Sequence, residues 1–132
     1  MATHQQSWVK VNTRVDCNMV RIVSALSSIS GLETLQSCEG DDRGEAYVHF
    51  WYGPSWERAC GIVFGGLLTA LQVAGVPATA AVEIFNGSLP TARIAFDARA
   101  LEQATLAVEK FTTESGLPRN SASVRDTEYR EP

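Results

Sequence analysis

The residues best suited to chemistry lie in one charged segment, 37–45, between two apolar runs. This segment contains a serine, a cysteine, four carboxylates, one arginine and two glycines. A hairpin that only reverses the chain uses a two-residue turn such as Asn-Gly, so this connection is long for that purpose. Loops carried by a rigid sheet are where binding and catalytic groups concentrate. The segment is therefore the first candidate for a functional site.

Cys38 is the candidate nucleophile or redox thiol of this loop. A reactive thiolate needs a positive environment, whereas Glu39, Asp41 and Asp42 surround Cys38 with negative charge. The charge pattern favours a small, partly buried cysteine at a strand end. We therefore predict no catalytic residue in the loop.

The four carboxylates of the loop are candidate ligands for a hard cation. Their spacing does not fit an EF-hand, whose loop places oxygen ligands at alternating positions. Surface loops usually carry charged residues because these stay exposed. The sequence favours a solvated acidic loop over a metal site, and it identifies no cofactor.

An aromatic stripe follows the loop, because Tyr47, His49 and Trp51 alternate with Val48 and Phe50. Such a stripe offers a surface on which flat rings stack. A histidine there can act as a general base, although a half-exposed sheet histidine is the commoner case. Loop and stripe together are the predicted ligand-binding site, whose members are Ser37, Cys38, Glu39, Gly40, Arg43, Tyr47, His49 and Trp51.

Each part of this predicted site has an expected role. Ser37 and the backbone of Gly40 donate hydrogen bonds, Glu39 accepts from a base or a ribose hydroxyl, and Trp51 supplies the stacking surface. The competing interpretation is that the loop is only a solvated connection between two strands.

The composition describes an ordinary globular domain of 132 residues, 45% hydrophobic and 20% charged. Its net charge of −4 argues against a general nucleic-acid binder and against binding to an anionic membrane. Residues 1–6 are polar and show no apolar signal region. Three scattered cysteines without a Cys-x-x-Cys pair fit a reducing compartment. The expected location is therefore the cytoplasm.

Hydrophobic periodicity predicts five strands and three helices in the order β-α-β-β-α-β-β-α. The strands are expected at 7–15, 32–37, 46–52, 79–85 and 91–96. The helices are expected to begin at the N-caps Asp16, Ser55 and Asp97 and to end before Gly31, Gly75 and Gly116.

This order predicts an α+β fold, a ferredoxin-like sandwich with a mostly antiparallel five-stranded sheet and all helices on one face. The last strand is expected to extend an edge of the sheet. Residues 1–116 form the single predicted domain, and 117–132 form a polar tail that we expect to be flexible.

The second predicted helix carries the glycines Gly61, Gly65 and Gly66. Each glycine inside a helix costs about 1 kcal/mol relative to alanine. We expect this cost to be offset by close approach of the helix to a sheet or to a second copy of the chain. We therefore predict a homodimer, formed through this helix or through the open face of the sheet.

The segment 29–40 and the strand 47–50 resemble the wybutosine-synthesis methyltransferases that modify tRNA, which carry Ser-Ser-Cys-Ser-Gly-Arg in a similar helix-strand-turn-strand setting. Here Ser37, Cys38 and Gly40 correspond, whereas Glu39 replaces a serine and the arginine after the glycine is absent unless Arg43 substitutes. The resemblance covers about a third of the chain, and the acidic composition fits a tRNA enzyme poorly. The Ser-Cys-Glu-Gly turn is also similar to one in small uncharacterised bacterial and phage proteins, and that resemblance implies no activity.

Two classes of function follow. The favoured one is a small module without catalysis that binds a small molecule, such as a nucleotide, or a protein partner. It includes a phage-type sequestering or inhibitor protein that acts by occupancy. The alternative is an enzyme related to the tRNA-modifying methyltransferases, acting through the loop from Ser37 to Gly40.

Overall fold

A computed structural model describes residues 6–8, 14–85 and 89–120 of the chain. Within them, four strands form one antiparallel sheet in the order β3-β4-β6-β5. Two further short strands, β1 and β2, pair antiparallel with each other. The strands are β1 Gln6–Trp8, β2 Arg14–Asp16, β3 Glu33–Cys38, β4 Glu45–Trp51, β5 Ala78–Phe85 and β6 Leu89–Asp97.

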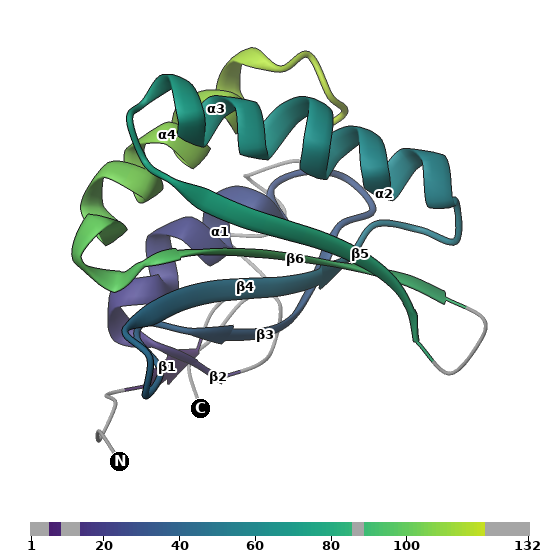
Figure 1. The fold of residues 1–132 in the computed structure, drawn as a ribbon. Coiled ribbons are helices and arrows are strands. Elements are labelled where there is room, and N and C mark those ends of the chain that lie inside the picture. The colour runs from purple at the N-terminus through teal and green to yellow at the C-terminus, as the bar shows by residue number, and fades with distance from the viewer. Residues whose placement is uncertain (1–5, 9–13, 86–88, 121–132) are drawn as a thin grey trace.

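Three helical segments cover one face of this sheet (Figure 1). Helix α2 continues through a π-helical stretch, η2, into α3, so that the chain is helical from Trp56 to Val73. The bounds are α1 Val20–Ser27, α2 Trp56–Ile62, η2 Val63–Leu67, α3 Leu68–Val73 and α4 Leu101–Glu114, with one-turn 3-10 helices η1 Cys17–Met19 and η3 Ala98–Ala100. No helix in the described ranges is long and apolar enough to cross a membrane.

The core lies between the sheet and the helices because alternate residues of the strands face the helical layer. Val48 and Phe50 of β4 and Ile94 of β6 are buried there together with residues of all three helical segments. Ala95, one position along β6, is buried but lies outside this cluster, as expected for the opposite face. The α+β class and the single covered face are as the periodicity predicts.

The strand order differs from the expected one. Strand β6 lies between β4 and β5 in the middle of the sheet and does not extend an edge. A ferredoxin-like order would place the first strand in the interior of the sheet; here β1 and β2 belong to a separate two-stranded sheet. The predicted strand 7–15 is also wrong as one strand, since its described parts pair with each other; 9–13 lie outside the described residues.

The glycine-rich helix does make a close approach, and the contact is within the chain. A Cβ atom at Gly66 would lie 2.7 Å from the ring of Phe111 on α4. Added Cβ atoms at Gly61 and Gly65 would have no neighbour within 4 Å. Gly66 therefore permits the packing of α2–α3 against α4, whereas the other two glycines lie on the outer surface.

The predicted tail begins with an ordered attachment. Arg119 forms a β-bridge with Ile29, and Asn120 donates from its backbone and its side-chain amide to the carbonyls of Ser28 and Ser27. Leu117 is partly buried against the core. These contacts hold residues 117–120 at the C-terminal end of α1; the rest of the tail lies outside the described residues.

Candidate functional site

The acidic loop is organised by one carboxylate. Asp41 Oδ1 accepts hydrogen bonds from the backbone N–H groups of Arg43 and Glu45, each at 2.9 Å. The hydrogen bond from Glu45, followed by that from Arg43, lowers the pKa of Asp41 below its usual value. The backbone of Gly44 then accepts from Ala98 at 2.8 Å, which ties the loop to the start of η3. Part of the charge in this loop therefore stabilises its own turn.

Glu39 also has a structural partner, at the beginning of the first helix. The buried carboxylate of Asp16 accepts the backbone N–H of Glu39 at 3.0 Å. The carboxylate of Glu39 in turn accepts the backbone N–H of Asn18 at 3.3 Å. Asp16 was predicted to cap the first helix with its own side chain, and it makes no such bond. The carboxylate that meets the start of this helical segment comes from the loop instead.

The strand register separates Ser37 and Cys38 onto opposite faces. Ser37 pairs with Val48 of the core face, and its hydroxyl is buried with no hydrogen-bond partner in the described part of the chain. Cys38 pairs with Tyr47 on the open face. Burial, as the largest effect, and the nearby carboxylates of Asp16 and Asp41 raise the pKa of the Cys38 thiol. The thiol is therefore protonated at neutral pH, which supports the prediction that Cys38 is not a nucleophile.

We expect iodoacetamide to alkylate Cys17 before Cys38. Cys17 is exposed, whereas Cys38 is partly buried and its raised pKa keeps the thiolate fraction low. Mass spectrometry of peptides from a time course at neutral pH measures the order. Faster labelling of Cys38 would show that the thiol is activated and would favour a catalytic role.

The aromatic stripe lies on the open face of the sheet, as predicted. Tyr47, His49 and Trp51 are partly exposed, and each has a cross-strand partner on β3 and on β6. His49 stands between Gln36 on β3 and Arg93 on β6. Trp51 stands opposite Thr91, and its indole N–H is buried without an acceptor among the described residues.

Arg93 completes this face and was absent from the predicted site. Its guanidinium lies over the ring of Tyr47, 4.8 Å from the ring centre, an arrangement in which a cation is attracted to the π-face. One carboxylate partner, Glu45, is at 3.9 Å, the outer limit for an ion pair. The sequence contained a signal for this residue, because Arg93 is the one arginine or lysine in β3, β4, β5 and β6. The residues that surround Arg93 could not be predicted from the sequence, because they depend on the pairing of β4 with β6.

Two titratable rings of this face, Tyr47 and His49, have pKa values shifted in the direction that keeps them uncharged at neutral pH. Burial, as the largest effect, lowers the pKa of His49; the charge of Glu83 acts against it and the charge of Arg93 adds to it. Burial, as the largest effect, raises the pKa of Tyr47. The rings of Tyr47 and His49 therefore lie uncharged beside the Arg93 cation, and carboxylates share this face, since Glu33 stands opposite Trp51 and Glu83 opposite Thr91.

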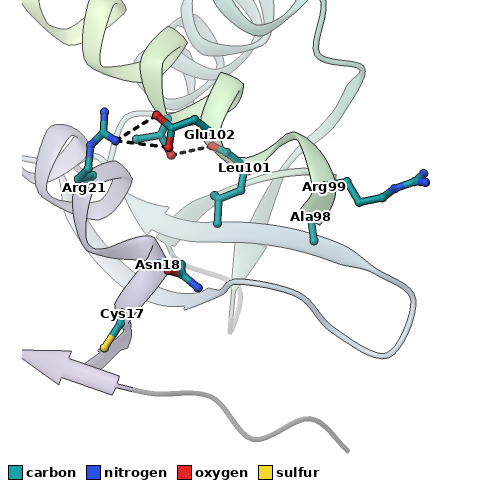
Figure 2. A pocket seen from close by; sticks show the side chains of 8 residues that line it. Cys17, Asn18, Arg21, Ala98, Arg99, Leu101 and Glu102 are labelled. Atoms are coloured by element: carbon teal, nitrogen blue, oxygen red, sulfur yellow. Dashed lines mark hydrogen bonds and ion pairs between the residues drawn. The ribbon is translucent and has the colours of Figure 1, made fainter.

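A separate pocket of about 440 Å³ opens beside the loop, where the beginnings of α1 and α4 meet (Figure 2). Figure 2 shows Arg21 directed to Glu102, while Arg99 points away. Arg21 also pairs with Glu109, and Arg99 pairs with Asp97 at 2.7 Å. The remaining lining residues are Cys17, Asn18, Ala98, Leu101 and Thr105. Both arginines in the lining are thus paired with carboxylates, and the pocket contains none of the predicted site residues.

The predicted site is therefore divided, and Ser37 leaves it for the core face. Cys38, Tyr47, His49 and Trp51 share the open face, while Glu39, Gly40 and Arg43 belong to the loop that packs against the helix starts. In the described part of the chain no three His, Cys, Asp or Glu side chains are grouped to hold a metal ion. No protein-family model, curated protein or solved structure matches this chain, so its function is inferred from its own residues.

Proposed function

We propose that this protein is a small α+β module that binds a flat, acceptor-bearing small molecule, with nucleotides as the first class to test, on the open face of its sheet. The observation that carries the proposal is the Arg93 guanidinium over Tyr47, next to His49 and Trp51 on one partly exposed face. A ring stacks on such a surface and an acidic group pairs with the guanidinium. Binding by occupancy also suits a sequestering or inhibitor protein.

The loop supports this proposal as a scaffold. Asp41 holds its turn and Glu39 meets the N–H of Asn18. The raised pKa of Cys38 opposes nucleophilic catalysis. These contacts favour a binding module over an enzyme that acts through the loop.

Replacing Trp51 by alanine should weaken binding of adenosine or guanosine monophosphate about tenfold or more, a loss of roughly 1.4 kcal/mol. The reason is the loss of a stacking surface on the open face. Isothermal titration calorimetry with each nucleotide measures the affinity. Trp56→Ala is the matched control, since Trp56 on α2 is 47% exposed and lies outside the site.

The control variant should bind as the wild type does. Equal affinities for the two tryptophan variants, or a wild-type protein that binds neither nucleotide, would contradict the small-molecule proposal. Capture of a protein partner that depends on Trp51 would then move the function to protein binding through the same face.

We also propose that the protein is a homodimer. The chain carries no charged residue from Ala59 to Val82, yet Gly61, Phe64 and Gly65 in this stretch are exposed. The solvent face of a surface helix is normally rich in charged and polar side chains. An uncharged exposed face is typical of a surface that is covered in an assembly.

A further inference from the structure

The two edges of the sheet are protected to different degrees. Strand β3 forms one edge; it has six residues, a register irregularity between Thr34 and Gln36, and β2 beside it. Short length and bulges are devices that prevent an edge from pairing with another chain. This edge is therefore protected.

Strand β5 forms the other edge and lacks these devices. It has eight residues, pairs with β6 in an uninterrupted register, and contains no proline or lysine and a single charge, Glu83. Figure 1 shows β5 at the outer side of the sheet beneath α2–α3, and in the described chain no strand pairs with its other side. A long, regular edge of this kind has backbone donors and acceptors available for another strand.

The helix above β5 provides an apolar margin to the same edge. Gly66 faces α4 through Phe111, so residues two positions away in either direction lie on the opposite side of the helix. Those residues are Phe64, which is 44% exposed, and Leu68, which is partly exposed. Helix α2–α3 packs over β5 and β6, while α4 contacts this helix, β6 and α1, so that α4 lies on the side away from the β5 edge. Phe64 and Leu68 therefore lie on the same side of the molecule as the β5 edge.

We infer that a second copy of the chain pairs with this edge, β5 against β5 in antiparallel orientation, so that the two sheets join across a twofold axis. The inference rests on the proposed homodimer and names its surface. Antiparallel pairing of two identical strands is self-complementary, since each strand supplies the donors and acceptors that the other needs. With the axis at Ala81, Glu83 lies opposite the partner subunit's Thr79, and the two Glu83 carboxylates do not face each other. The uncharged margin formed by Phe64 and Leu68 is then covered as well.

Thr79→Glu is the variant that tests the interface. Thr79 is exposed, and the change gives each β5 a second carboxylate, so that strands of like charge would have to pair. The dissociation constant of the dimer should rise roughly tenfold or more, as measured by sedimentation equilibrium. Leu35→Glu is the control, because it adds the same charge at a 48% exposed position of the protected edge. Both variants should keep the circular dichroism spectrum of the wild type.

Hydrogen exchange gives a second measurement on the unmodified protein. Amides of β5 should exchange more slowly as the protein concentration rises, while those of β3 should not change. A wild-type protein that stays monomeric at micromolar concentration overturns the homodimer itself. A dimer that Thr79→Glu and Leu35→Glu leave equally tight overturns only its assignment to β5 and leaves the homodimer standing.

Discussion

Replacing Leu71 by alanine should lower the free energy of unfolding by about 2–5 kcal/mol. Leu71 on α3 has no exposed surface and belongs to the core between the helices and the sheet. The change removes three carbon atoms from that core and leaves a cavity that the surrounding residues fill only in part. Chemical denaturation, followed by circular dichroism, measures the loss.

Leu106→Ala is the matched control for this prediction. Leu106 lies on α4, also a helix, and is 53% exposed. The same chemical change there should cost less than about 1 kcal/mol, because folding buries little of the apolar surface of the Leu106 side chain. Equal losses at the two positions would mean that the helices do not pack on the sheet as described.

Replacing Asp16 by alanine should cost about 1–3 kcal/mol, which is the typical penalty for leaving a buried hydrogen-bonding group without its partner. The carboxylate of Asp16 is buried and accepts the N–H of Glu39. Its loss should loosen both the loop and the contact of Glu39 with Asn18. Equilibrium denaturation measures the stability, and hydrogen exchange of residues 38–41 should show that this loop opens more often.

Two further substitutions define what Asp16 contributes. Asp42→Ala removes an exposed carboxylate from the same loop and should change stability by less than about 0.5 kcal/mol. Asp16→Asn keeps an oxygen that can accept the N–H of Glu39, so its cost should lie between the other two. If Asp16→Ala is as harmless as Asp42→Ala, the loop is not anchored through this carboxylate.

These contacts give the acidic loop a structural role. Its charges lie together in the sequence, and the carboxylates of Asp41 and Glu39 stabilise the fold. Asp41 stabilises the turn, and Glu39 meets a helix start that is 21 residues away along the chain. The surface available to a ligand is the open face of the sheet, on β4 and its neighbours β3 and β6.

The local elements were determined by the sequence itself. Ser55 and Asp97 accept hydrogen bonds from Arg58 and Arg99, as predicted for helix caps. The alternation along β4 places Val48 and Phe50 in the core, and Tyr47, His49 and Trp51 opposite them. Caps and alternation act between residues that are close in the sequence, so they can be recognised without knowing how distant segments meet.

Only the tertiary structure decided how distant segments combine. Strand β6 lies in the centre of the sheet, and this position places Arg93 beside His49 and over Tyr47. Gly66 packs against Phe111. At the start of the first helix the carboxylate of Glu39 accepts a backbone hydrogen bond, in place of the predicted cap. Each of these contacts joins segments whose pairing depends on the packing of the whole chain, which periodicity and caps do not specify. The sequence thus determined which residues line each face, and the packing decided which faces and edges meet.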